Sequence, residues 1–130
     1  MQNFYLCKHC GSIAVLVVDK GVPWVCCGEN MTLLAPNTVD ASQEKHLPVI
    51  TSSSNSISVQ IGSALHPMED AHHIAFVYVV TKHGDRSPAG GQRKPLNVDD
   101  EPRASFAFVD DQPVAVYAYC NLHGLWKTEV

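Results

Sequence analysis

The clearest pattern in the chain is a series of short runs of β-branched and aromatic residues after residue 36. Gly, Pro, Asn, Asp or Ser bounds each run, and these residues are typical of the turns between strands. Several short strands within about 90 residues favour an antiparallel β-sandwich, so the predicted fold class is all-β. One helical turn at most is predicted, at 40–45. The predicted strands are 47–50, 57–61, 74–80, 104–109 and 114–119.

The segment 81–103 is predicted to be a surface loop. It contains the small-residue stretch Ser-Pro-Ala-Gly-Gly at 87–91, but no Gly-Lys-Ser/Thr follows that stretch. A loop that cradles phosphate in the P-loop manner requires such a continuation. A phosphate-binding role is therefore not predicted for this segment.

The first 36 residues are predicted to form a separate module, because a proline and turn formers follow them before the strands begin. Two short strands are predicted here, at 13–18 and 22–25. Phe4 and Trp24 are predicted to form the core of the module. A module of this size is too small to fold on apolar burial alone, so bound metal would supply part of its folding energy.

Four cysteines in this module have a spacing typical of metal ligands. Cys7 and Cys10 lie three residues apart, and Cys26 and Cys27 are adjacent. The predicted turn between the two strands brings the pairs together around one ion. Zinc ribbons usually separate both pairs by two residues, so this spacing favours iron and zinc about equally and a disulfide less. His9, between the first pair, is predicted to be an exposed side chain and not a ligand.

Composition and charge limit the classes of function. Hydrophobic residues make up 45% of the chain, and no apolar run approaches the roughly 18 residues that span a bilayer. The N-terminus shows no secretion signal, so a cytoplasmic location without membrane attachment is expected. In that reducing compartment, the five cysteines are better explained as metal ligands than as disulfides. The net charge of −4 disfavours nucleic acid and anionic membranes as partners, so any attraction for an anion must be local.

A second group of candidate ligands centres on Cys120 and His123, which follow the last predicted strand. This Cys-x-x-His step lets both side chains face one ion, and Gly124 frees the backbone immediately afterwards. Further donors are expected upstream, and the candidates are His46, His66 and His72. Four imidazoles and one thiolate suit iron better than structural zinc, which prefers four ligands. The nearby residues predicted not to be ligands are Met68, His73 and His83.

Four motifs stand out when these residues are taken together. They are Cys7-x-x-Cys10 with Cys26-Cys27, Glu44-Lys45-His46-x-Pro48-Val49, His66-Pro67-Met68-Glu69 with His72, and Cys120-Asn121-Leu122-His123-Gly124-Leu125-Trp126. In this combination, and over nearly the whole chain, they resemble desulfoferrodoxin, the family of two-iron superoxide reductases. The segment 81–103 departs from the family pattern and contains no site residue.

The resemblance implies a desulforedoxin-like module at 1–36 with a rubredoxin-type iron, and an immunoglobulin-like sandwich at 37–130 with the catalytic iron. It implies reduction of superoxide to hydrogen peroxide, with an open sixth position on the catalytic iron. Lys45 can draw the anion to the site, and Glu44 is implied to reach ferric iron once peroxide has left. The implied ligands are Cys7, Cys10, Cys26 and Cys27 for the first iron, and His46, His66, His72 and His123 with axial Cys120 for the second.

The expected partners are superoxide, a rubredoxin-like electron donor and a second copy of the chain in a homodimer. Whether calcium helps to hold such a dimer is left open. Two other functions are also left open by the residues: a non-catalytic iron protein that carries electrons, and a zinc-ribbon interaction module fused to a β-sandwich. Metal analysis distinguishes the zinc-ribbon module from the enzyme. Two irons per chain would support the superoxide reductase, whereas zinc at both sites would exclude it.

Overall fold

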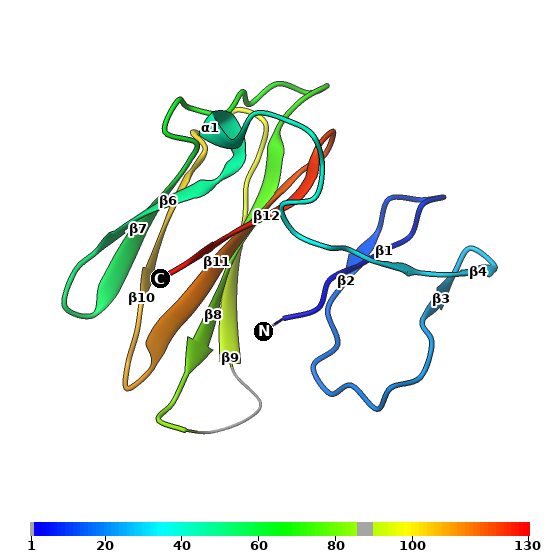
Figure 1. The fold of residues 1–130 in the computed structure, drawn as a ribbon, viewed down its shortest axis with the longest axis horizontal. Helices are drawn as coiled ribbons and strands as arrows, with labels where there is room; N and C mark the ends of the chain where they lie inside the picture. Colours follow the sequence, from blue (N-terminus) through cyan, green and yellow to red (C-terminus); the bar gives the residue numbers. More distant parts are fainter. Residues whose placement is uncertain (1, 86–89) are drawn as a thin grey trace. The chain divides into compact units, whose positions relative to one another are not determined.

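The computed structural model describes residues 2–85 and 90–130. The chain divides into two compact units, 1–35 and 36–130, and in both of them the paired strands run antiparallel (Figure 1). The all-β prediction is confirmed. Within the described ranges, no helix is long and apolar enough to cross a membrane.

The first unit contains five strands of two residues each. β1 (Tyr5–Leu6) lies between β2 (Ile13–Ala14) and β5 (Thr32–Leu33) in a small sheet. β3 (Val25–Cys26) and β4 (Glu29–Asn30) form a separate hairpin. Both strands predicted for this unit are therefore shorter in the structure, and most of the unit is loop held by turns and by the cysteine cluster described below.

The core of the first unit is smaller than the sequence indicated. Phe4 is buried, at 1% exposure, whereas 43% of Trp24 is exposed, so the prediction that Trp24 is a core residue is wrong. Trp24 lies just before β3, and a unit of this size has too few elements to cover a second large ring. Val17 and Val18 are also exposed, because β2 ends before reaching them.

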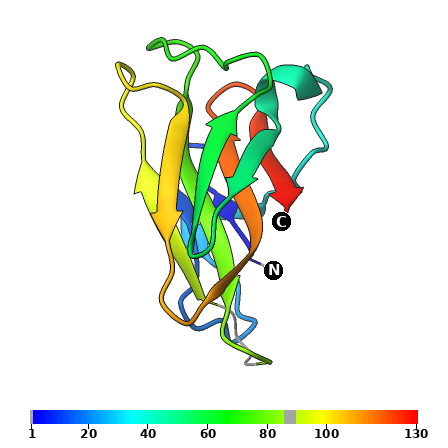
Figure 2. The same ribbon diagram turned by 90° about the vertical axis from the view of Figure 1, so that its left-hand side faces the viewer.

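The second unit is a sandwich of two antiparallel sheets. The first sheet has the order β10-β7-β6, and Figure 2 shows it in front of the second, which has the order β12-β11-β8-β9. The predicted antiparallel sandwich is confirmed. The strands of the first sheet are β6 (Pro48–Ser52), β7 (Ser56–Ile61) and β10 (Arg103–Ala107). Those of the second are β8 (Ile74–Lys82), β9 (Gly90–Pro95), β11 (Gln112–Cys120) and β12 (Gly124–Glu129).

The core lies between the two sheets and follows the period-two alternation of strands. On β7, every second residue is buried, and on β8 and β11 the buried positions are more continuous because these strands are central in their sheet. The fully buried side chains include Ile57, Val59, Ile61, Val77, Val79, Phe106 and Val116. This core continues to Cys120, so the last residue of β11 carries a thiol into the apolar interior.

Two of the described strands of the second unit were not predicted from the sequence. β9 lies inside the segment 81–103 that was expected to be a loop, and it pairs with β8 from Phe76↔Pro95 to Thr81↔Gly90. Its side chains are mostly exposed because it is an edge strand, so it lacks the apolar run that marks the other strands. β12 was also missed, since it follows a turn within the ligand motif. The Ser-Pro-Ala part of the small-residue stretch at 87–91 lies outside the described residues.

The turn after β7 packs against the main chain of the short helix α1 (Gln43–His46). The Ala64 N–H donates a hydrogen bond to the Glu44 carbonyl at 3.2 Å. Gly62, at φ +84°, lies so close that a Cβ there would be 2.8 Å from the Lys45 carbonyl oxygen. Only glycine fits this approach, which holds in place the helix that carries the first histidine of the candidate site.

We expect Gly62→Ala to destabilise the sandwich more than Gly84→Ala. Both glycines have positive φ, so each substitution costs about 1 kcal/mol in backbone strain. A Cβ at Gly84 would meet nothing within 4 Å, whereas at Gly62 it would overlap backbone atoms that cannot rotate away. Urea titration gives each free energy of unfolding, and Gly62→Ala should lose about 1–3 kcal/mol more. Equal losses would mean that the backbone around α1 yields at little cost.

Two candidate metal centres

The first candidate centre is a cluster of four cysteine sulfurs in the first unit. The four sulfurs lie within 4.8 Å of one another, with 3.7 Å between Cys10 and Cys26 and 3.9 Å between Cys26 and Cys27. Cys7 follows β1, and the Gly11 N–H donates to its carbonyl at 2.9 Å, which closes a tight turn that contains Cys10. The structure therefore brings together all four cysteines that the sequence singled out.

The adjacent ligands Cys26 and Cys27 are accommodated by the turn of the β3–β4 hairpin. Cys27 and Gly28 are the two central residues of this turn, with φ of +53° and +76°. Positive φ at both central positions is the requirement of a type I′ turn, which is favoured between two twisted strands. Cys27 is one of the few non-glycine residues with positive φ among those described, and this conformation lets consecutive side chains reach one point.

The protonation of these thiols shows that the cluster fits a cation. Donation from the Ser12 hydroxyl, 3.1 Å from Cys10, lowers the pKa of the Cys10 thiol to about 6. Hydrogen bonds with Cys7 and then Cys10 raise the pKa of Cys26 to about 12. Without an ion, Cys10 favours the thiolate while Cys26 keeps its proton, because adjacent thiolates repel one another. An ion at this position would stabilise all four thiolates.

His9 is directed away from a ligand role by its contact with a carboxylate. Its Nε2 contacts the Glu29 carboxylate, and both side chains are more than half exposed. The pair joins the Cys7–Cys10 turn to the β3–β4 hairpin, so it links the two halves of the cluster. Sequence reasoning did not include Glu29, whose position two residues after Cys27 was the available signal.

The second candidate centre lies at one end of the sandwich, where α1, the β7–β8 connection and the β11–β12 turn meet (Figure 1). Donor atoms of four residues lie within 4.8 Å of one another there: His46, His66, His72 and Cys120. His123 joins them, with its Nδ1 3.1 Å from Nε2 of His46 and 3.8 Å from the Cys120 sulfur. All five residues predicted as ligands of this centre therefore converge.

The hydrogen bonds of the rings determine which nitrogen of each histidine faces the others. Nδ1 of His46 lies 2.6 Å from the Ser42 carbonyl, and Nδ1 of His66 lies 2.7 Å from the Pro67 carbonyl. A carbonyl oxygen accepts a hydrogen bond, so Nδ1 carries the proton in both rings. Nε2 is then the unprotonated nitrogen of each ring. The atoms that face one another, and that could bind a metal ion, are thus Nε2 of these two rings and Nδ1 of His123.

Two buried nitrogens in this centre have no hydrogen-bond partner. They are Nε2 of His66 and Nε2 of His72, each with almost no exposed surface. Burial without a partner costs free energy, and such groups in native proteins usually mark a bound ion or water. Together with the buried thiol of Cys120, these nitrogens fit a metal ion that accepts imidazole and thiolate donors.

Burial also sets the protonation of the donors. It lowers the pKa of His46 and His72, and it lowers the pKa of His66 to about 4, so these rings are neutral near pH 7. Burial raises the pKa of the Cys120 thiol, while the backbone N–H groups of His123 and then Leu122 oppose this by donating to the sulfur. Metal binding would therefore release the thiol proton but few imidazole protons.

Trp126 supports this centre, although sequence reasoning assigned it no role. Its ring stacks on His46 with 4.8 Å between centroids and 26° between planes. Its indole N–H donates to the His123 carbonyl at 3.1 Å. Trp126 is 1% exposed, so it is a buried side chain that contacts both His46 and His123. The signal in the sequence was its place three residues after His123 on the strand that leaves the ligand turn.

The residues predicted not to be ligands have other contacts. His73 Nδ1 lies 3.0 Å from the Glu69 carbonyl, and His83 pairs with Asp111 at 3.2 Å. The Met68 sulfur accepts a hydrogen bond from the Ile74 N–H and packs against the core.

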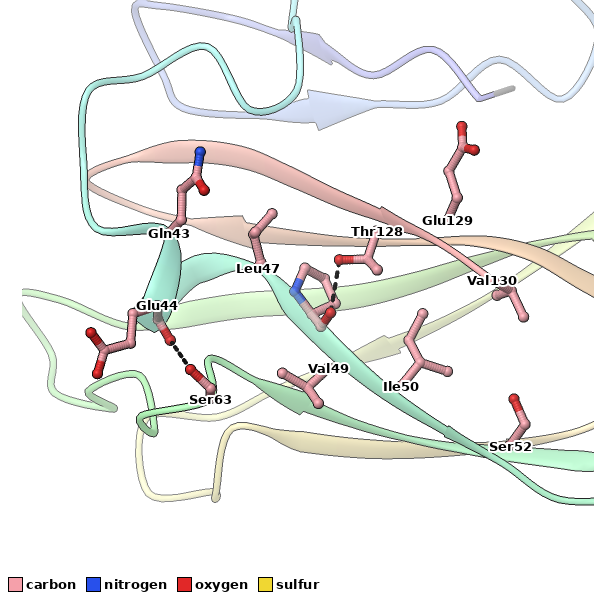
Figure 3. A pocket seen from close by; sticks show the side chains of 11 residues that line it. Gln43, Glu44, Leu47, Val49, Ile50, Ser52, Ser63, Thr128, Glu129 and Val130 are labelled. Atoms are coloured by element: carbon pink, nitrogen blue, oxygen red, sulfur yellow. Dashed lines mark hydrogen bonds between the residues drawn. The ribbon is translucent and has the colours of Figure 1, made fainter.

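Glu44 and Lys45 are the two residues before His46 on α1, and both side chains are exposed. After burial and the other histidines, the charge of Lys45 contributes to the lowered pKa of His46, and it contributes likewise at His72. The positive charge of Lys45 is thus close enough to act on both rings. The Glu44 side chain is exposed and is one of the residues that line the groove drawn in Figure 3.

That groove has a volume of about 520 Å³ and runs along the side of the sandwich between β6 and the end of β12. Leu47, Val49 and Ile50 supply much of its lining, and a hydrogen bond from the Thr128 hydroxyl to the Pro48 carbonyl crosses it (Figure 3). None of the nine cysteine and histidine residues of the two candidate centres lines it. The donor chemistry therefore lies at the histidine cluster and not in this groove.

Comparison with known proteins relates both centres to one family. The profile described as Desulfoferrodoxin matches residues 38–129, which include the segment 81–103 that departs from the expected pattern. This chain belongs to the desulfoferrodoxin family.

The relatives of this desulfoferrodoxin include proteins that match both units. A desulfoferrodoxin of Syntrophotalea carbinolica is 40% identical over 125 residues, covering 96% of this chain and 94% of that protein. A superoxide reductase of Pyrococcus horikoshii is 36% identical over 103 residues, covering 70% of this chain and 90% of that protein. The crystal structure of the superoxide reductase from Treponema pallidum matches with a TM-score of 0.80 and 34% identity, covering 99% of each chain.

The two donor sets fit the two irons of a desulfoferrodoxin. Four cysteine sulfurs in the first unit suit a rubredoxin-type iron, and four imidazoles with one thiolate suit a mononuclear iron in the second. Two iron ions per chain are therefore its cofactors.

The neutral histidines predict a pH dependence for the metal-free protein. His66 has a pKa of about 4 when folded and 6.5 as an unperturbed group, so the unfolded chain binds more protons between these values. Stability should be intact above pH 6.5 and fall as the pH drops toward 4, with a decrease in Tm of roughly 10 °C from this residue. Thermal unfolding by circular dichroism, after removal of metal with a chelator, measures the effect.

The controls for this measurement are two substitutions of histidine by glutamine. His66→Gln should flatten the dependence of Tm on pH, because the titrating group has been removed. His83→Gln, at an exposed histidine far along the chain from the ligands, should leave the dependence as in the parent. The same slope in all three proteins would show that other groups govern the acid instability.

Proposed function

We propose that this desulfoferrodoxin is a superoxide reductase, which converts superoxide, one electron and two protons into hydrogen peroxide. The observation that carries the proposal is the convergence of four imidazoles and Cys120 at one end of the sandwich. The same chain aligns along 99% of its length with the superoxide reductase of Treponema pallidum. The proposed metal ligands are the nine residues described above, in two separate sets.

Iron held by the second set supplies one-electron redox chemistry, and a thiolate among its ligands makes it electron-rich. The charges of the ligand side chains favour such an electron-rich iron. Burial keeps the imidazoles of His46, His66 and His72 neutral, so the Cys120 thiolate brings the negative charge. Two backbone N–H groups donate to that sulfur and stabilise it as a thiolate.

Lys45 is proposed to attract superoxide to the centre. It is exposed on α1 next to His46, and its charge acts on His46 and His72. The protein as a whole carries a net charge of −4, which would repel an anion. A cation at the edge of the site attracts an anion locally and raises the rate of encounter.

Glu44 is proposed to supply a carboxylate to the open side of the centre after the product has left. Its main chain is fixed, because its carbonyl accepts hydrogen bonds from the Ala64 N–H and the Ser63 hydroxyl (Figure 3). Its side chain extends into solvent and is free to change rotamer. A fixed backbone with an exposed carboxylate suits a group that enters and leaves the site.

The first unit is proposed to receive electrons from a rubredoxin-like donor at its four-sulfur iron. Homodimer formation through this unit is supported by large apolar side chains exposed between β2 and β3, which are Val17, Val18, Val22 and Trp24. A cytoplasmic location and a role in removing superoxide during oxidative stress belong to the same proposal. A structural calcium ion stays a prediction without support from a described residue.

We expect Cys120→Ser to abolish superoxide reduction even when iron is bound. A serine oxygen, neutral or weakly donating, cannot replace the electron donation of the thiolate. Stopped-flow kinetics with superoxide, with iron content and peroxide yield measured on the same sample, test the expectation. Turnover near that of the parent in an iron-replete variant would remove Cys120 from the ligand set, and zinc in place of iron in the native protein would remove the proposed reaction.

Cys10→Ser is the matched control for this experiment. It exchanges the same atoms at the other centre, so the four-sulfur iron should be lost while the sandwich stays folded. A single turnover of the prereduced catalytic iron should survive in Cys10→Ser. A non-catalytic electron carrier, the alternative function, would show no peroxide formation in either variant or in the parent.

We expect Lys45→Ala to slow the second-order reaction with superoxide by about tenfold at low salt. It should also flatten the dependence of the rate on ionic strength, because a screened attraction has been removed. Lys45→Glu should invert that dependence, so that added salt speeds the reaction. Stopped-flow rates across a salt series measure both effects.

Lys82→Ala is the control, since Lys82 is an exposed lysine at the end of β8 remote from Ile74 and the ligand loop. It changes the net charge by the same amount as Lys45→Ala. Parallel salt series for the parent, Lys45→Ala and Lys82→Ala would overturn the steering role of Lys45.

A further inference from the structure

His72 lacks the ring hydrogen bond that orients two of the other candidate ligands. His46 and His66 each have Nδ1 against a main-chain carbonyl. Within the described part of the chain, no hydrogen bond reaches either ring nitrogen of His72, and its Nε2 is buried without a partner. Histidines that bind metals almost always donate their second N–H to a fixed acceptor. Apart from ring contacts with His66 and His123, the described groups that fix His72 are therefore those that hold its backbone.

That backbone is held on both sides of His72 by one side chain, the amide of Asn121. Its Oδ1 accepts a hydrogen bond from the His73 N–H at 2.8 Å. Its Nδ2 donates to the Ala71 carbonyl at 3.1 Å. The Asn121 backbone N–H adds a third bond, to the His73 carbonyl at 3.2 Å.

The clamp acts where the regular strand pairing is interrupted. The register between β11 and β8 shifts between Tyr119 and Cys120, whose partners are Phe76 and Ile74. Beyond this irregularity the ladder ends, and the segment 69–72 closes on itself through two hydrogen bonds between Glu69 and His72. This small turn is rigid internally, so what remains to be set is its position relative to the Cys120–His123 turn.

We propose that Asn121 is a positioning residue for the second metal centre, which acts by fixing His72 relative to Cys120 and His123. Asparagine suits the task because its amide offers an acceptor and a donor together, and the clamp needs one of each. The inference rests on the metal-binding part of the proposed function and not on superoxide turnover. Its test therefore uses metal retention as the readout.

The matched control for Asn121 is Asn37, which makes the same kind of clamp elsewhere in the sandwich. The Asn37 amide donates to the Lys127 carbonyl at 3.0 Å and accepts from the Lys127 N–H at 2.8 Å. Its backbone N–H donates to the Leu125 carbonyl at 3.0 Å. Asn37 also has φ +61°, so Asn37→Ala should cost at least as much folding stability as Asn121→Ala.

The experiment measures release of ferrous iron to a chelator from the full-length protein with both centres loaded. The four-sulfur centre is the internal reference, because neither asparagine belongs to its unit. In Asn121→Ala, iron should leave the histidine centre about tenfold faster, the lower end of the usual loss when an outer partner of a ligand is removed. In Asn37→Ala the rate should change much less, because Asn37 holds the backbone on either side of Trp126 and bonds to no residue next to His72. Equal acceleration in both variants would overturn the proposal, since general loosening of the sandwich would then explain it.

A double-mutant cycle tests whether the effect passes through His72. In a His72→Ala background, Asn121→Ala should change iron release by less than about twofold, because the residue it positions is already absent. The full tenfold effect in that background would contradict the assignment. If Asn121→Ala does not fold, Asn121→Asp serves instead, since it keeps the acceptor for His73 and loses the donor for Ala71. An Asn121→Asp protein that retains iron as the parent does would also overturn the proposal.

The two proposals fail in distinguishable ways. Absence of peroxide formation in the iron-loaded parent would remove the superoxide reductase function and leave the iron-release result unaffected. Normal iron retention in Asn121→Ala would remove the positioning role and leave the function unaffected.

Discussion

Two buried imidazole nitrogens without partners are the constraint on which the ligand end of the sandwich depends. Nε2 of His66 and of His72 would each bond to water in the unfolded chain, so burying them unpaired costs about 1–3 kcal/mol each. A metal ion offsets that cost and also compensates the burial of the Cys120 thiol. The connections at this end of the sandwich therefore form one site, because each brings a donor that the others need.

The two units solve the problem of stability differently. The sandwich has a continuous core of side chains such as Ile61, Val79 and Val116, and the metal site occupies only its end. Among the described residues of the first unit, only Phe4 and Cys7 are buried. That unit depends on the ion held by its four sulfurs, because its apolar burial is too small to offset the entropy of ordering the chain.

The surroundings of the second centre are mostly main-chain and neutral groups. Carbonyls of Ser42 and Pro67 orient two rings, and Trp126 covers one face of His46. Two charged side chains act on the rings: Lys45 on His46 and His72, and the Glu69 carboxylate on His72 in the opposite sense. Such a centre combines a thiolate ligand with a nearby lysine that attracts an anion, within a protein whose net charge is negative.

The sequence by itself determined the donor types, their grouping into four sulfurs and five mixed donors, and most strands of the sandwich. These properties are local: metal-ligand spacing and the alternation of apolar residues are both written in short segments. β9 could not be found in this way, because an edge strand with exposed side chains is defined by its pairing with β8. Trp24 was misplaced for a related reason, since burial depends on which elements lie above a ring.

Only the tertiary structure decided how the donors face one another. The choice of Nδ1 in His123 and Nε2 in His46 depends on atoms from connections that are far apart in sequence. Asn37 and Asn121 each donate one hydrogen bond and accept one through the side-chain amide, and each donates a third from the backbone N–H. Only Asn121 makes these bonds to the residues on either side of a candidate ligand, His72. Hydrogen bonds between distant segments have no local pattern, so their roles appear only when the chain has brought both partners together.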